Sequence, residues 1–102
     1  IMLPHIIRYN IAGNHEKYAR VAALMGQEIE GLSPMEAAES AVAAIQELLD
    51  AVNVSYHLKD YGIPEEDLPK LVAGAMKQSR LFIPNPRDLN ESDVTAIYQN
   101  AY

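Results

Sequence analysis

The pattern of apolar and polar positions predicts a chain built from helices. Its clearest stretch runs from Ser33 to Val52, where apolar side chains recur at helical spacing. Ser33 is a suitable N-cap, Pro34 fits the first helical position, and Glu36 completes an S-x-x-E capping box. The expected buried stripe begins with small side chains and continues with bulky ones: Ala38, Ala41, Val42, Ile45, Leu48, Leu49 and Val52. We therefore expect a central helix whose small end lets a neighbouring helix approach closely.

Four weaker patterns predict further helices, over 1–10, 15–25, 63–79 and 91–102. Proline breaks a helix interior. Pro4 must therefore lie in the first turn of its helix or at a kink, and Pro69 requires that its helix start near Asp67 or that a short separate turn precede it. Asn14 and Asn90 are the expected N-caps of the second and last helices. The side chains expected to face inward from these helices are Tyr18, Val21, Ala22, Met25, Leu68, Leu71, Val72, Ala75, Met76, Val94, Ile97, Tyr98 and Ala101. With no convincing strand, the fold class is all-α, a helical bundle of four to five helices.

The segment from Leu81 to Asn90 contains two prolines and is expected to be extended, because the residue before a proline avoids the α region. Its Asn85-Pro86-Arg87 motif is the most distinctive in the chain. One interpretation makes Arg87 an anion or carboxylate clamp, since a guanidinium forms charge-assisted hydrogen bonds. The other, which we favour, is a structural turn whose arginine bonds the carbonyl groups at a helix end.

Composition narrows the classes of function. The 102 residues suit one domain, and the net charge is −6, from eight Lys and Arg against fourteen Asp and Glu. This balance argues against nucleic acid and against an anionic membrane as partners, since both favour a basic surface. No unbroken apolar run is long enough to cross a bilayer. The chain has no cysteine, hence no disulfide framework and no thiolate metal site, which leads us to expect a cytoplasmic location.

The side chains that could carry chemistry form no complete active site. The histidines, His5, His15 and His57, have none of the spacings that place metal ligands on one helix face, so we expect structural roles for them. The acidic run 65–67 could supply acid–base groups, but it is better explained as a helix start that favours negative charge. We therefore expect no catalytic, cofactor-binding or metal-binding residue in this chain.

Four segments taken together resemble a known family. They are LPHIIRYN, HEKYARVAALMG, DYGIPEEDLPKLVAGAM and NPRDLNESDVTAIYQNAY. In this order and spacing they are similar to the C-terminal region of iron-containing (group III) alcohol dehydrogenases. Within that family they resemble most the lactaldehyde reductase or 1,2-propanediol oxidoreductase branch. The resemblance implies the distal part of a dehydroquinate synthase-like helical domain. In that family an N-terminal domain binds NAD or NADP, and one aspartate and three histidines hold iron, sometimes zinc.

The resemblance also implies what this chain lacks. The last metal histidine of the family precedes the LPH segment, so His5 does not match a ligand position. We expect residues 1–102 to be a single, partial helical domain from which the nucleotide-binding domain and the metal-ligand region are absent. The residues just before Asn-Pro-Arg approach the substrate cleft in the family, which makes Leu81 and Phe82 candidate cleft-lining residues here.

Two functions follow as expectations. The first is a truncated or fragmentary metal-dependent alcohol dehydrogenase whose parent transfers hydride between an alcohol or aldehyde and NAD(P), and which is inactive as this chain alone. The alternative is a free-standing helical module for protein–protein interaction or dimerisation, derived from the same fold. The expected partner is accordingly a second copy of the chain or the missing N-terminal half of the enzyme.

Overall fold

All regular secondary structure in the chain is helical. The computed structural model describes all residues, 1–102, and contains six α-helices, three short 3₁₀ segments and no strand. The α-helices are α1 (Leu3–Asn10), α2 (His15–Leu24), α3 (Pro34–Ala51), α4 (Leu68–Met76), α5 (Ser79–Phe82) and α6 (Glu91–Ala101). The 3₁₀ segments are Ile11–Gly13, Leu58–Tyr61 and Glu65–Asp67. The all-α prediction is confirmed, with one helix more than expected, and no helix is long and apolar enough to span a membrane.

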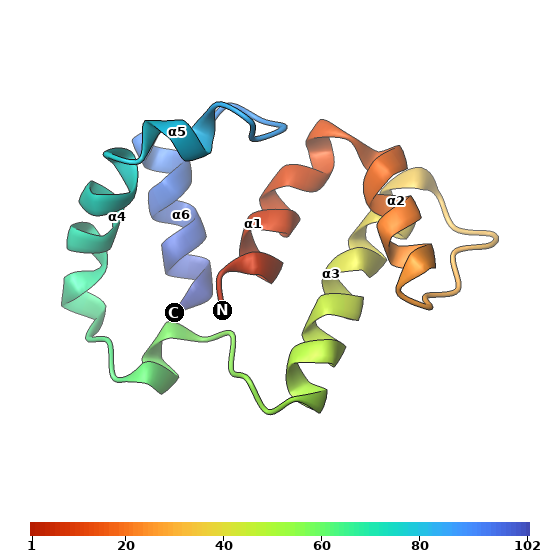
Figure 1. Ribbon diagram of the computed structural model, residues 1–102, viewed down its shortest axis with the longest axis horizontal. Helices are drawn as coiled ribbons and strands as arrows, with labels where there is room; N and C mark the ends of the chain where they lie inside the picture. Colours follow the sequence, from red (N-terminus) through yellow and green to blue (C-terminus); the bar gives the residue numbers. More distant parts are fainter.

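The helices form a flat slab in which α1 lies between two helix pairs. Figure 1 shows α2 and α3 side by side on one flank and α4 with α6 on the other, with α5 across one end of the second pair. The molecule measures 42 × 31 × 19 Å, so its thin dimension holds about two helices of ~10 Å diameter. Only 17 of the 102 residues are buried, which leaves much apolar surface at the faces of the slab. Near the two chain ends, Met2 and Tyr102 pack against one small buried cluster.

The predicted start of the central helix is confirmed. The Ser33 hydroxyl accepts a hydrogen bond from the Glu36 backbone N–H at 3.2 Å, and the Glu36 carboxylate accepts one from the Ser33 N–H at 2.9 Å. Ala38 and Ala41 of α3 and Ala22 of α2 are fully buried. Small side chains on both helices thus allow the close packing of α2 against α3.

The predicted stripe is wrong toward the end of α3 and in part of α2. Leu48 and Val52 are 54% and 57% exposed, and Val21 in α2 and Met25 just after it also face solvent. For α3 the reason is length. The 18 residues of α3 span about 27 Å, and the 10 residues of α2 only about 15 Å. The partner therefore covers the first part of α3 and leaves its last turns uncovered.

The expected helix boundaries hold where a local group sets them. Pro4 and Pro69 both lie in first turns, and a 3₁₀ turn precedes α4, as Pro69 required. The side chains of Asn14 and Asn90 accept backbone N–H groups at 3.0 and 2.9 Å, which confirms both as N-caps. Each of these signals acts within one helical turn, so the sequence alone specifies it.

The prediction of an extended segment is wrong for its first three residues. Leu81 and Phe82 end α5, and Ile83 has φ −56° and ψ −49°, in the helical region although Pro84 follows it. Backbone hydrogen bonds outweigh the preference of a residue before proline. The N–H of Ile83 donates to Ser79 O at 3.4 Å, and that of residue 85 donates to Phe82 O at 3.1 Å. Regular structure then stops until α6.

Candidate functional site

An apolar groove lies where α1, α4, α5 and α6 meet. It encloses about 660 Å³, and ten of its fourteen lining residues are hydrophobic. The lining residues are Met2, Ile6, Lys70, Leu71, Gly74, Ala75, Gln78, Leu81, Phe82, Asn85, Leu89, Val94, Ile97 and Tyr98. Its volume is in the range of small-molecule sites, which are concave and mostly apolar. We therefore take it as the candidate functional site.

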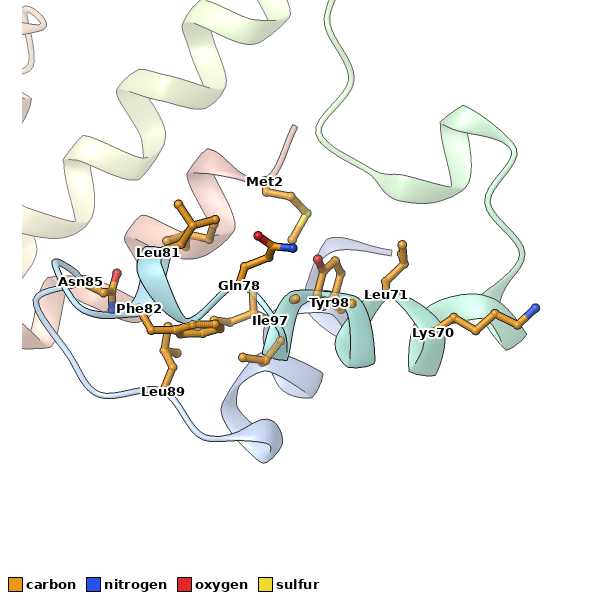
Figure 2. A pocket seen from close by; sticks show the side chains of 14 residues that line it. Met2, Lys70, Leu71, Gln78, Leu81, Phe82, Asn85, Leu89, Ile97 and Tyr98 are labelled. Atoms are coloured by element: carbon orange, nitrogen blue, oxygen red, sulfur yellow. The ribbon is translucent and has the colours of Figure 1, made fainter.

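Both residues predicted to line a substrate cleft lie on this groove. Leu81 and Phe82 reach it from α5, and Figure 2 shows the Phe82 ring beside Leu89 and Ile97. Leu81 is 58% exposed and Phe82 is half-buried, so the two form a wall of the groove with one solvent-facing side. Their role toward a substrate stays a prediction.

The groove offers few polar groups. Lys70 extends away from it in Figure 2, and its ammonium donates to the Asp67 carboxylate at 2.8 Å. This hydrogen bond raises the pKa of Lys70 above its ordinary value. Gln78 and Tyr98 are the other side chains on the groove with polar atoms, apart from Asn85. The arrangement can hold an apolar chain, but it contains no acid–base pair for chemistry of its own.

The Asn-Pro-Arg motif joins the end of this groove to α1. The side-chain amides of Asn10 and Asn85 bond each other in both directions, at 2.7 and 2.9 Å. Arg87 donates to the carbonyl oxygen of Tyr9, in the last turn of α1, at 2.6 Å, and its guanidinium lies 4.0 Å from the centre of the Tyr9 ring. Arg87 thus bonds a helix-end carbonyl, the geometry that the structural-turn interpretation describes. Binding of an anion by Arg87 stays a prediction.

The three histidines lie apart from the groove, and only two of them lie near each other. His5 is buried and donates from Nε2 to the carbonyl oxygen of Tyr56 at 2.6 Å, and its ring centre is 6.4 Å from that of His57. Burial is the main cause that lowers the pKa of His5, while the Tyr56 hydrogen bond acts in the opposite direction. Nε2 of His15 is buried without a hydrogen-bond partner.

The structure shows no cluster of possible metal ligands within this chain. Nowhere do three His, Cys, Asp or Glu side chains come together as a metal ion would require. His5 already uses Nε2 in its bond to Tyr56, which removes that nitrogen as a ligand. The acidic run Glu65–Asp67 forms the 3₁₀ turn before α4, and Asp67 is paired with Lys70. The residues present do not fit an iron centre.

Sequence reasoning missed most of the groove. Met2 lines it from just before α1, Ile6 lines it from α1, and Leu89 lines it from the turn before α6. Ile97 and Tyr98 were expected to face inward, and they do so at the edge of this groove. A periodic stripe identifies a face that avoids water, but it does not tell a filled core from a groove.

The comparisons with known proteins agree along the whole chain. Residues 1–102 match the Fe-containing alcohol dehydrogenase family, C-terminal. The 1,3-propanediol dehydrogenase of Klebsiella pneumoniae is 43% identical and the lactaldehyde reductase of Escherichia coli (strain K12) 37% identical, each over 102 residues. The NAD-dependent methanol dehydrogenase of Bacillus methanolicus is 29% identical over 101 residues. The first two alignments cover 100% of this chain and the third 99%, and each covers 26% of the relative.

Solved structures give the same result. A crystal structure of 1,3-propanediol oxidoreductase superposes with a TM-score of 0.92 at 43% identity, over 100% of this chain and 26% of that one. An alcohol dehydrogenase from Oenococcus oeni superposes with a TM-score of 0.91 at 34% identity, over 99% and 26%. The chain thus spans about a quarter of the length of these relatives. Its whole length nevertheless matches in both sequence and fold, and the chain belongs to the iron-containing alcohol dehydrogenase family, to whose C-terminal region it corresponds.

Proposed function

We propose that this chain is the C-terminal helical part of a larger alcohol dehydrogenase that transfers hydride between an alcohol or aldehyde and NAD(P). The observation that carries the proposal is the match of all 102 residues, at up to 43% identity, to about the last quarter of a family of dehydrogenases. Three relatives are named for propanediol, lactaldehyde and methanol, which supports a small alcohol or aldehyde as substrate. One of them is named as NAD-dependent, which supports a nicotinamide cofactor.

We further propose that the chain is inactive by itself. Its residues do not form a metal site, and the groove contains no acid–base pair. Any iron or zinc, and the nicotinamide, would then be held by parts of the protein outside these 102 residues. The chain's own contribution is a helical wall: Leu81 and Phe82 line the groove, and in our proposal they form the substrate end of the cleft. The cytoplasmic location expected from the cysteine-free composition also stays a prediction.

The test compares two preparations. One is the purified chain 1–102, and the other is the native polypeptide that contains it. We expect alcohol-dependent NAD(P) reduction and stoichiometric iron or zinc, measured by elemental mass spectrometry, only in the native polypeptide. Turnover or a stoichiometric metal in the purified chain would contradict the inactive part of the proposal. A native polypeptide of 11.3 kDa without turnover would contradict its dehydrogenase part.

A second candidate is a free-standing interaction or dimerisation module. The observation that favours it is the amount of uncovered apolar surface, including Leu24 at 78% and Ile83 at 84% exposure. Large exposed apolar side chains often mark a contact surface when they form a patch. Either a second copy of the chain or the N-terminal half of the enzyme could cover them. Light scattering of the purified chain separates the two: a stable dimer favours the module, and a monomer that binds an N-terminal half favours the dehydrogenase.

A further inference from the structure

The amide pair at the end of the groove connects residues that are 75 positions apart. Asn10 is the last residue of α1 and is only 3% exposed, and Asn85 lies in the turn after α5. Each amide donates to the oxygen of the other, at 2.7 and 2.9 Å. Since a buried amide without partners costs free energy, the two side chains stabilise each other only when the turn lies against α1.

Asn85 lines the groove, but it has no donor left for a ligand. One of its two amide protons goes to Asn10, and the other goes to the backbone oxygen of Arg87 at 2.7 Å. Its oxygen accepts from Asn10. An asparagine amide has only two donor protons, so all of its donor capacity is used inside the protein. This excludes direct hydrogen-bond donation to a substrate and leaves a positioning role.

Further contacts fix the same turn. Arg87 donates to Tyr9 O, and the Tyr9 hydroxyl donates to Asp88 O at 2.9 Å. Gly13 approaches the turn so closely that a Cβ there would lie 2.9 Å from Pro86 O. The turn is thus held from the α1 side by polar contacts and close backbone packing.

The wall of the groove that precedes this turn is held only in part by its own packing. Phe82 is half-buried, but Leu81 is mostly exposed, as is Ile83, which follows the wall, so burial of these side chains contributes only part of what holds the wall in place. The backbone N–H of Asn85 donates to Phe82 O at 3.1 Å, which attaches the wall directly to the fixed turn. Displacing Asn85 would therefore displace Phe82 and its neighbours.

We propose that Asn10 and Asn85 are positioning residues that hold the wall formed by Leu81 and Phe82, and that they thereby set the length of the alcohol that the groove side of the site accepts. The inference rests on the proposed function, because it assigns the wall to the substrate end of a dehydrogenase site. It goes beyond that function by naming the pair, far from each other in sequence, that determines the chain-length preference.

The experiment uses the native polypeptide with Asn10→Ala, Asn85→Ala and the double replacement. The readout is the ratio of kcat/KM for hexanol to that for ethanol. A variant that is only less stable lowers the amount of active enzyme for both alcohols equally and leaves this ratio unchanged. A methylene in a well-formed apolar pocket changes kcat/KM by about tenfold or more, so a released wall should change the ratio by at least about threefold. The double replacement should add little to the larger single effect, because the two amides act as one unit.

Two further variants complete the design. Asn100→Ala removes an amide from an exposed position on α6 away from the groove, and it should leave the ratio unchanged. Gly13→Ala pushes on the turn without touching either amide, and it should change the ratio even if Asn10→Ala does not fold. A ratio equal to that of the wild type in all folded Asn10, Asn85 and Gly13 variants would overturn the inference.

Hydrogen exchange separates this inference from the proposed function. In the Asn10 and Asn85 variants, peptides covering 79–89 should lose protection by about tenfold or more, while those of α3 keep theirs. If the wild-type polypeptide turned over no alcohol, both the proposed function and the length preference would be overturned. Hydrogen exchange would still show whether Asn10 and Asn85 anchor the wall. Wild-type turnover with an unchanged length ratio would overturn this inference alone.

Discussion

The same substitution, glycine to alanine, should have opposite effects on stability at two positions. At Gly13 a Cβ would lie 2.9 Å from both Pro86 O and Arg87 Cγ, where ordinary contacts begin at 3.4 Å. One of these atoms is backbone, so the turn itself must move. Overpacking of this kind costs about 1–3 kcal/mol, and the lower chain entropy of the unfolded state offsets about 0.4–1 kcal/mol of it. We expect Gly13→Ala to reduce the free energy of unfolding by about 1–2 kcal/mol.

Gly74 is the matched control. It lies inside α4, and a Cβ there would meet no atom within 4 Å. Alanine is the better helix former by about 0.5–1 kcal/mol, so Gly74→Ala should stabilise the chain by that amount. Urea unfolding followed by far-UV circular dichroism measures both changes. Equal signs for the two variants would refute the reasoning, because it derives the difference entirely from the space around each Cβ.

Three further predictions test other parts of the structure. Ser33→Ala removes the capping box of α3 and should cost about 1 kcal/mol in urea unfolding; a cost near zero would show that packing alone fixes this helix start. Ala41→Leu should destabilise the fully buried side of α3 by about 1–3 kcal/mol, whereas Ala43→Leu, on the exposed side of the same helix, should stay within about 0.5 kcal/mol. Burial lowers the pKa of His5 in the folded state below its ordinary value of 6.5. As the pH falls from 6.5, the unfolded state therefore binds more protons at this position than the folded state does. The free energy of unfolding should decrease accordingly. In His5→Gln this part of the pH dependence should disappear from unfolding curves measured across the same range; an unchanged dependence would assign it to another group.

The sequence predicts those features that one helical turn specifies. Ser33 with Glu36, Asn14 and Asn90 were all assigned correctly as helix starts, because the groups that cap a helix lie within three residues of each other. The exposed Leu48 was assigned wrongly for a reason of another kind. Its burial depends on whether a partner helix is long enough to cover it, and no residue near Leu48 carries that information.

The candidate site follows from the sequence only where a motif marks it. The order of motifs predicts that Leu81 and Phe82 line a substrate cleft; both lie on the groove, and their role toward a substrate stays a prediction. The pairing of Asn10 with Asn85 was not predicted, since it joins positions 75 residues apart and asparagine has many other roles in turns. The helical conformation of Ile83 before Pro84 was also missed, because hydrogen bonds of the turn outweigh the local preference.

The most direct test of the central claim is the intact mass of the native polypeptide that contains this chain. The chain has a mass of 11.3 kDa and spans 26% of its relatives, so membership as the C-terminal part of a dehydrogenase predicts a polypeptide about four times as heavy. Mass spectrometry of the protein purified from its source gives the answer without any assumption about substrate or metal. A mass near four times 11.3 kDa would support the account, and a native mass of 11.3 kDa would contradict it and leave the interaction module as the function to pursue.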